Sequence, residues 1–339
     1  MPAWQAERST VNQRVQIGAE STSALGTPVA ASKLLECFDW TFGINPEIND
    51  YTPTGHKYVN IREENEEWVD LTVGGTLDYN GLIYLLGGAM GATNVAVHGS
   101  STTAKDWIYT PPVYGSIVPQ TYTLQQGDTT RAHQTAYSLF NSFGYTLTRK
   151  EIKVSAKGIT QPISDGITLT SSPTAVALAP IVGKHINVYL DSTSGGLGTT
   201  QLTKVLQVDY SFDGVYGPFW PLNRSNVGFT AHVDLTPKTT VKLKMEADSV
   251  GMAMLGYLQQ GTTYYLRVQA QGNQIASDGP GAVYNTFQHD MAIKVGKPSP
   301  FSDDSGIFAI EWECVVVEDP SWGTGKAQTV TVTNLITAL

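Results

Sequence analysis

The residue types that perform acid–base, nucleophilic and metal chemistry are present in this chain, but not in the spacings that such chemistry requires. Catalytic zinc sites often place two histidines on one helical turn, as in HExxH, and structural sites use paired cysteines. The histidines show no HExxH or HxH spacing and no pairing with cysteine; they are His56, His98, His133, His185, His232 and His289. We therefore expect no metal site and no cofactor.

Three short segments share residues with catalytic or ligand-binding motifs but depart from their spacing. Gly323-Thr324-Gly325-Lys326 has Pro320 where a phosphate-binding loop needs glycine, and Ala327 where it needs a hydroxyl group for Mg²⁺. A turn between two strands is expected there instead. His98-Gly99-Ser100-Ser101 lacks the GxSxG spacing of a nucleophile elbow. Asp303-Asp304-Ser305-Gly306 is too short for a calcium loop and predicts a hairpin turn. These departures indicate that the protein is not an enzyme.

The densest charge feature is the acidic cluster Glu63-Glu64-Asn65-Glu66-Glu67. Like charges repel and favour solvent, so one interpretation is a solvated hairpin tip between a strand ending at Ile61 and a strand beginning at Trp68. The other is that the glutamates project beyond the sheet, where they line a pore or contact a stacked neighbour. Asp303 and Asp304 are further candidates for such contacts. Both interpretations stay open on the sequence alone.

Tryptophans are numerous and allow two interpretations. Side chains on alternating strands usually pack in a core, whereas exposed aromatic rings form sugar-binding platforms. The tryptophans concerned are Trp40, Trp68, Trp107, Trp220, Trp312 and Trp322.

Most of the chain reads as β-strands. Alternation of apolar and polar residues recurs, as in Val241-Lys242-Leu243-Lys244-Met245, and residues 308–317 predict a long strand that ends before Pro320. Short helices are expected at residues 79–90 and 249–260, with Asp78 or Asn80 and Asp248 or Ser249 as N-caps and glycines 87 and 261 near their ends. A third helix is expected at residues 129–138.

The two halves of the chain share a residue pattern in the same order, at an offset of about 172 residues. The matching segments are Val15-Gln16-Ile17 with Val188-Tyr189-Leu190, Leu25-Gly26-Thr27 with Leu197-Gly198-Thr199, Asp39-Trp40-Thr41-Phe42 with Asp209-Tyr210-Ser211-Phe212, and Val69, Leu71 and Val73 with Val241, Leu243 and Met245. We expect two tandem, duplicated domains, residues 1–165 and 166–339. Each is expected to be a β-sandwich or β-barrel with one short flanking helix.

Composition excludes several classes of function. The 339 residues include only 15% charged residues and carry a formal net charge of −9, so no basic face is available for nucleic acid. The N-terminal segment lacks the apolar core of a signal peptide, and no apolar run is long enough to span a membrane. Cys37 and Cys314 sit in apparent strands and are expected to be buried free thiols.

A family resemblance runs over nearly the whole length. It is carried by Gln16-Ile17-Gly18-Ala19-Glu20-Ser21-Thr22 followed by Gly26-Thr27-Pro28-Val29-Ala30, by residues 75–91, by Val188-Tyr189-Leu190-Asp191 with Gly198-Thr199-Thr200, and by Val330-Thr331-Val332-Thr333-Asn334. With these segments the chain resembles the major tail tube proteins of long-tailed bacteriophages, in which subunits form stacked rings.

The resemblance implies a structural virion protein that acts in the tail and assembles in the host cytoplasm. It implies rings around a channel, occupied by a tape-measure protein during assembly and crossed by DNA without specific binding. Tail tip and terminator proteins are the other implied partners. Because the chain is internally repeated, three chains are expected per pseudo-hexameric ring, with six as the alternative. We expect the acidic excess to face the channel, and Val330, Thr331, Val332 and Thr333 to form an inter-subunit strand. The competing hypothesis is a carbohydrate- or receptor-binding β module of a virion.

Overall fold

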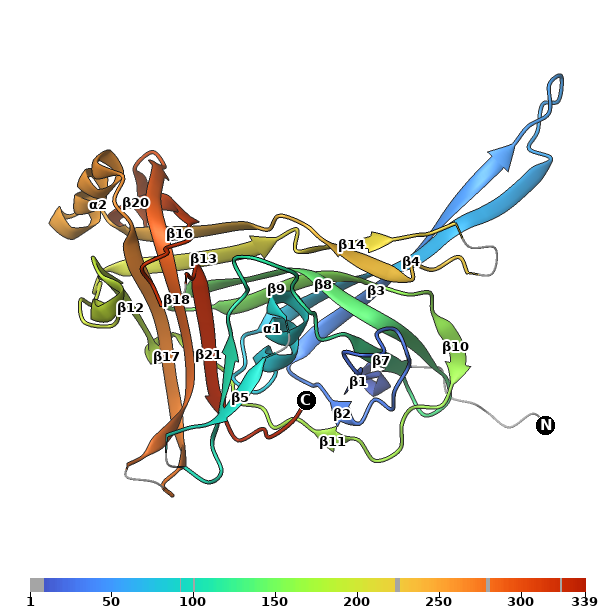
Figure 1. Cartoon of the computed structure of the whole chain (residues 1–339), viewed down its shortest axis with the longest axis horizontal. Helices are drawn as coiled ribbons and strands as arrows, with labels where there is room; N and C mark the ends of the chain where they lie inside the picture. The colour runs from blue at the N-terminus through green and yellow to red at the C-terminus, as the bar shows by residue number, and fades with distance from the viewer. Residues whose placement is uncertain (1–8, 92, 100, 223–225, 279–280, 324) are drawn as a thin grey trace.

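The chain folds almost entirely into β-strands, which confirms the prediction of an all-β fold with minor α content. In the computed structural model, strands account for 53% of the residues and helices for 9%. The structure describes residues 9–91, 93–99, 101–222, 226–278, 281–323 and 325–339. Some long strands follow the longest axis of the molecule and others run across it, and one hairpin extends well beyond the rest (Figure 1).

The N-terminal half contains a short 3₁₀ turn, several long strands and one helix. Its elements are η1 (Thr10–Asn12), β1 (Arg14–Ala19), β2 (Lys33–Leu34), β3 (Phe38–Tyr51), β4 (Ile61–Thr76), α1 (Leu82–Met90), β5 (Asn94–Val97), β6 (Lys105–Tyr109), β7 (Tyr122–Gly127), β8 (Ala132–Thr148), β9 (Ile152–Thr160), β10 (Ser164–Ile167) and β11 (Thr174–Ala175).

The C-terminal half has a similar succession of strands around a second helix. Its elements are η2 (Gly183–His185), β12 (Ile186–Asp191), η3 (Ser194–Gly196), β13 (Val205–Asp213), β14 (Tyr216–Phe219), β15 (Ala231–Asp234), β16 (Lys238–Glu246), α2 (Ser249–Gln260), β17 (Tyr264–Ala276), β18 (Val283–Pro298), β19 (Ser302–Asp304), β20 (Ile307–Val316) and β21 (Gln328–Asn334).

Both halves use the same order of antiparallel pairings. In the N-terminal half the order is β1–β7–β8–β9–β4–β3, and in the C-terminal half it is β12–β17–β18–β20–β16–β13. A helix follows β4 in one half and β16 in the other. The expected domain boundary at residues 165 and 166 falls inside β10. Because β10 pairs with β8, the N-terminal half extends past that boundary.

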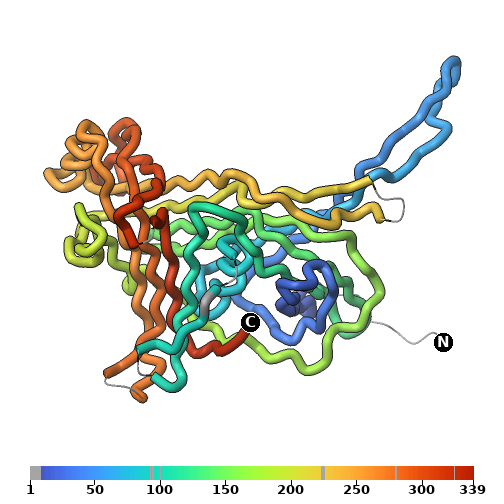
Figure 2. Tube along the Cα trace, in the orientation of Figure 1, coloured from blue at the N-terminus to red at the C-terminus, as the bar shows by residue number. Residues whose placement is uncertain are grey.

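Two seams join the halves into one structure. The end of β8 pairs with β13 over Ser142–Thr148 and Gln207–Asp213, and β21 lies between β18 and β6. The first seam makes a continuous run of strands in the order β3, β4, β9, β8, β13, β16, β20 and β18–β19, which we call the long sheet. The tube trace shows this sheet running across the molecule (Figure 2).

One face of the long sheet is the core face, as the period-two pattern predicts. Leu71, Tyr145, Tyr210, Leu243 and Trp312 lie on this face and are at most 3% exposed. Helix α1 lies within the same core, and every one of its residues is buried. A Cβ at Gly88 would lie 2.2 Å from the ring of Phe140, so the helix can approach β8 this closely only with glycine there.

The helix predictions were partly correct. Helix α2 spans Ser249–Gln260 as predicted, because Asp248 accepts hydrogen bonds from the amides of Val250 and Gly251, and Gly261 ends the helix with φ of 63°. Helix α1 begins later than expected, at Leu82, because the Asp78 side chain instead holds a turn by accepting from the amides at positions 80 and 81.

The predicted end of α1 at Met90 is confirmed, although the helix passes through Gly87 and it is Gly91, with φ of 97°, that follows its last residue. One further helix prediction was wrong. The expected helix at residues 129–138 is instead the beginning of β8, where pairing with β7 and β10 outweighs local helix preference.

Candidate functional site

The acidic cluster lies on the shaft of a hairpin and not at its tip. Strand β3 pairs with β4 from Phe38 opposite Gly75 out to Tyr51 opposite Ile61, so the tip consists of residues 52–60. The expected tip between Ile61 and Trp68 was wrong, because β4 continues through those residues. The glutamates lie opposite residues 46–49 of β3 and are Glu63, Glu64, Glu66 and Glu67.

This hairpin projects beyond the long sheet, as the second interpretation of the cluster required. Strand β4 pairs with β9 only from Val69 onward, and all residues from 46 to 65 are exposed except the half-buried Asn49. We call residues 46–67 the arm; it is the blue hairpin at the upper right of Figure 1. Its base is held where the Glu67 amide donates to the Val227 carbonyl at 3.0 Å, beside the edge-to-face pair of Trp68 and Trp220.

The arm concentrates negative charge. It carries six carboxylates and only two basic side chains, Lys57 and Arg62. Arg62 lies 3.5 Å from Asp50, which leaves the glutamates without a basic partner among the described residues. Partial burial, together with the neighbouring Glu64, raises the pKa of Glu67. The arm is therefore the strongest acidic feature of the described surface.

Asp303 and Asp304 lie far from the glutamates in the sheet. They end β19, and the predicted hairpin turn is confirmed: Ser305 and Gly306 have φ of 55° and 88° and lead into β20. Asp304 forms an ion pair with Lys244 at 2.7 Å. This turn and the arm occupy opposite ends of the long sheet, so the two groups of candidate residues do not form one site.

The expectation for the segment Val330–Thr333 is not met. The segment is part of β21, which pairs with β18 on one side and β6 on the other. Val330 and Val332 are fully buried and Thr333 is 3% exposed. Both hydrogen-bonding edges are thus satisfied within the chain, and the segment presents no free edge to another subunit.

The long sheet has free edges elsewhere. Among the described strands, β3 pairs only with β4, and β19 pairs only with β20. Beyond Ile293, the end of β18 pairs only with β20. Unpaired edges of this kind bind another strand unless something blocks them. The sequence pattern predicted these strands but gave no signal for which edges stay open, because that depends on distant pairings.

The seam between β8 and β13 shows how such an edge is satisfied inside the chain. Tyr145 lies directly opposite Tyr210, and their rings stack at a centroid distance of 5.1 Å. Phe143 is opposite Phe212 and also contacts Tyr210. His289 of β18 contacts both tyrosines. In the sequence, Tyr145 belongs to no motif, and His289 stands out only as a histidine without metal-ligand spacing. The alternation in residues 132–148 was the signal that would have found the strand.

The exposed face of the long sheet is polar and carries both signs of charge. Asp209 lies opposite Lys242, which in turn lies opposite Glu313. On β9, Lys153 and Lys157 are exposed on the same face. The expected acidic excess is therefore not concentrated on this face; the arm carries more of it.

No cluster of three or more metal-ligating side chains occurs in the part of the chain that the structure describes. Both cysteines are free, and burial raises the pKa of each to about 12, so neither is a ready nucleophile. Cys314 lies in β20 as expected, whereas Cys37 lies just before β3. Ser100 and Thr324, from two of the motif-like segments, lie outside the described residues.

The tryptophans form no exposed platform in the described structure. Trp40, Trp107 and Trp312 are buried, and the other three are half-buried; these are Trp68, Trp220 and Trp322. Core packing accounts for the first group, and no observation favours a sugar-binding surface.

Comparison with known proteins gives no family assignment. No protein-family model matches this sequence, and no curated protein matches it. None of the described helices combines the length and the apolar character needed to cross a membrane. The proposal of a function therefore rests on the edges of the long sheet, the arm and the resemblance noted in the sequence.

Proposed function

We propose that this protein is a structural virion protein, the major tail tube subunit of a long-tailed bacteriophage, that forms rings by pairing the two free edges of its long sheet. One observation carries the proposal: the seam between β8 and β13 inside the chain is a template for a seam between chains. If the halves are duplicated units, the end of β18 with β19 corresponds to the end of β8, and β3 corresponds to β13. Copies joined head to tail then repeat one contact and close into a ring.

Strand register, combined with the match of Val69 to Val241, supports one set of corresponding positions. Val69 and Val241 match in the sequence repeat; Val69 lies opposite Ile44, and Val241 lies opposite Tyr210. Ile44 thus corresponds to Tyr210, four residues away from the match with Trp40 that the sequence suggests. Counting along β20 and β9 in the same way makes Asp303 correspond to Tyr145.

Burial supports this correspondence. Tyr210 and Phe143 are 3% and 0% exposed at the internal seam. Their counterparts on the free edges are Ile44, which is 58% exposed, and Phe301, which is 52% exposed and stacked on Phe308. Pairing of β3 from one copy with β18–β19 of the next would bury these side chains as the internal seam buries theirs.

The proposed ring contains three chains, and six is the alternative. With two units per chain, three copies present a pseudo-sixfold arrangement. The polar face of the long sheet lines the channel, where balanced charges favour passage of the tape-measure protein and DNA without adhesion. No step of this function requires catalysis or a cofactor.

Crosslinking tests the ring directly. A chain carrying Ile44→Cys and Asp303→Cys places one thiol on each free edge, and directly opposite residues of antiparallel strands lie within disulfide range. Oxidation of the concentrated protein should give a ladder on a non-reducing gel that stops at three chains. A ladder that stops at six supports the six-chain ring in place of three.

The control pair is Thr41→Cys with Asp303→Cys. Thr41 lies on the same strand as Ile44 but out of register with Asp303, so no ladder is expected. Absence of any ladder from the Ile44 and Asp303 pair, or a ladder that stops at two chains, contradicts the proposed ring.

A further inference from the structure

The segment between η3 and β13 pairs with β12 over only a short length. The Leu202 amide donates to the Val188 carbonyl at 2.8 Å. Lys204, two residues later, would lie opposite Ile186 if this pairing continued. Its carbonyl instead accepts from the Glu246 amide of β16 at 3.2 Å. The starts of β12 and β13 therefore diverge, and a cleft opens between them.

The backbone of Ile186 faces this cleft without a partner. Successive residues of a β-strand direct their amide and carbonyl groups to opposite sides. The Val188 carbonyl points toward Leu202, so the groups of Ile186, two residues earlier, point to the same side. No described residue forms a hydrogen bond to them on this side. A free strand edge of this kind pairs with an added strand.

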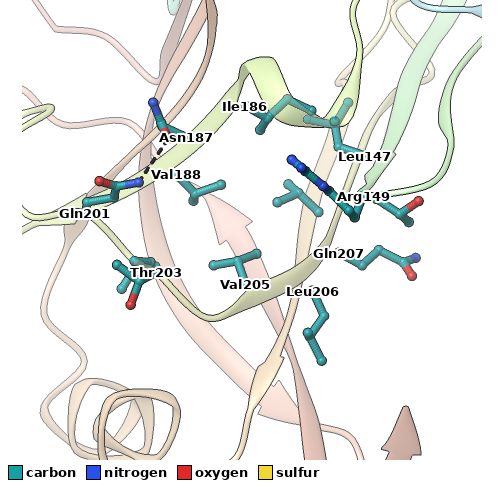
Figure 3. A pocket seen from close by; sticks show the side chains of 14 residues that line it. Leu147, Arg149, Ile186, Asn187, Val188, Gln201, Thr203, Val205, Leu206 and Gln207 are labelled. Carbon is teal, nitrogen blue, oxygen red and sulfur yellow. Dashed lines mark hydrogen bonds between the residues drawn. The ribbon is translucent and has the colours of Figure 1, made fainter. Parts of the chain in front are cut away.

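The cleft has an apolar interior with a volume of about 390 Å³. It lies between β12, the start of β13 and the β8–β9 turn (Figure 3). The apolar side chains that line it include Leu147, Val188 and Leu202, which are buried, and Ile186, Val205 and Leu206, which are half-buried. A wall of this kind receives every second side chain of an extended peptide, while the side chains between them face solvent.

Basic side chains surround the cleft. Arg149 lines it from the β8–β9 turn, beside Lys150, and Lys184 lies in η2 next to Gly183 of the wall. The three basic residues are exposed, and none of them forms an ion pair with another described residue. An unpaired guanidinium at the mouth of an apolar cleft is complementary to a carboxylate.

The N-terminal half already contains an added strand. Strand β11 runs parallel to β2, with the Thr174 amide donating to Ser32 at 2.8 Å and the Val176 amide donating to Leu34 at 3.0 Å. Val176 is buried there. In the C-terminal half, the segment 200–202 lies in the same place beside β12 and pairs with β12 alone among the described strands. This fold thus accepts a strand that is added without a hairpin, and the C-terminal half lacks one.

We propose that the cleft binds an extended peptide segment of another protein, which pairs with the Ile186 backbone and places a carboxylate on Arg149. The segment is short, with apolar side chains at every second position, and its carboxylate is either a chain end or an acidic side chain. The proposed ring uses β3 and β18–β19, so this site goes beyond that function and does not depend on it.

Fluorescence anisotropy with labelled hexapeptides tests the site on the full-length chain. The first probe alternates valine and threonine and ends in a free carboxylate. The second has an amidated end and a final glutamate, and the third is amidated and uncharged. At least one of the first two should bind, and the third should bind at least about tenfold more weakly, because it offers Arg149 no charge. The better of the first two identifies the source of the carboxylate.

Two further changes separate strand pairing from simple attraction. N-methylation of alternate amides in the tighter probe removes its backbone donors and should weaken binding at least about tenfold. Arg149→Glu should weaken it by at least as much, since two negative charges then face each other. Lys157→Glu is the matched control, because Lys157 is exposed in the middle of β9, and it should leave the affinity unchanged.

The site is contradicted if neither carboxylate probe shows saturable binding up to about 1 mM. It is also contradicted if the N-methylated probe binds as well as its parent, or if Arg149→Glu behaves like the Lys157→Glu control. A chain that binds the probe but forms no rings would contradict the proposed function alone, and a chain that forms rings but binds no probe would contradict this site alone.

Discussion

The environment of His289 fixes its protonation state. It is fully buried, with Nδ1 at 2.9 Å from the Tyr145 hydroxyl and Nε2 at 3.2 Å from Oε1 of Gln328. Tyr210 packs on its other side and donates to the same Gln328 oxygen at 2.7 Å. Burial lowers the pKa of His289 to about 3, although the Gln328 contact opposes this shift. The imidazole is therefore neutral in the folded protein over the ordinary pH range.

Acid should destabilise the protein through this residue. The unfolded chain binds the proton near pH 6.5, whereas the folded chain binds it near pH 3. Stability is thus complete above about pH 6.5 and falls with decreasing pH down to about 3, by at most about 1.4 kcal/mol per pH unit. Denaturant unfolding at several pH values measures the slope. His289→Gln should flatten it, and His56→Gln at the exposed arm tip should not. Equal slopes in all three proteins would rule out this role of His289.

At the scale of single residues, the sequence showed where charged residues and alternating patterns occur, but not which residues lie beside them in the fold. The glutamates of the arm were identified by composition, yet their place on a strand follows from pairing with residues 46–49 of β3. Val330–Thr333 were correctly seen as alternating, yet β6 and β18, which cover them, lie far away in sequence. Periodicity describes one strand and carries no information about which distant strand lies beside it.

At the scale of elements, one buried carboxylate organises the start of each half. Glu20 follows β1 and accepts from the amides of Gly26 and Tyr137, and from the Thr121 and Thr123 hydroxyls at 2.8 and 3.0 Å. In the other half, Asp191 ends β12 and accepts from three amides, those of Gly198, Thr199 and Thr200. Gly26 and Gly198 both have positive φ, which explains the glycines in the repeated Leu-Gly-Thr pattern.

Removing the negative charge of either carboxylate should destabilise the fold. Glu20→Gln turns an amide donor toward groups that also donate, and should cost about 2–3 kcal/mol. Asp191→Asn should cost somewhat less, about 1–2 kcal/mol, because it loses fewer charge-assisted bonds. Urea unfolding measures both values. Glu36→Gln, at an exposed site, should stay within about 0.5 kcal/mol of wild type. If Glu20→Gln had the same free energy of unfolding as that control, the Glu20 carboxylate would not stabilise the segment that contains Gly26.

Element predictions succeeded where local chemistry decides the structure. Helix α2 has an aspartate cap and a terminal glycine, and its limits were predicted to the residue. The segment 129–138 also follows an aspartate, because Asp128 accepts from the amides of Thr130 and Arg131, yet its strand conformation comes from pairing with β7 and β10 on either side. Local signals therefore predicted ends of elements, while tertiary pairing determined their partners.

For the whole molecule, the sequence repeat predicted two units but carried no information about how the strands of the two halves connect. The two halves share one pairing order. However, strand register matches Tyr210 of β13 to Ile44 of β3, whereas the sequence repeat matches it to Trp40, four residues away. The seams made by β8 with β13 and by β21 with β6 had no sequence signal. These seams determine which edges stay free, and the proposed assembly depends on those edges.

Proteolysis of the arm should report the assembly state of the whole molecule. Lys57 and Arg62 are exposed on the arm and are trypsin sites, so trypsin should cut the free chain there while the long sheet stays intact. If the arm docks in the next ring, single rings should be cut as fast as free chains, and tubes should resist at least about tenfold longer, because cleavage then follows the rare undocked state. Gel analysis of time courses on separated rings and tubes measures this difference.

Lys157, paired within the sheet, should remain uncut in every state. Protection that already appears in single rings would instead assign the arm to a neighbour within the ring, and equal cleavage of tubes and free chains would leave the arm without any partner in the tube.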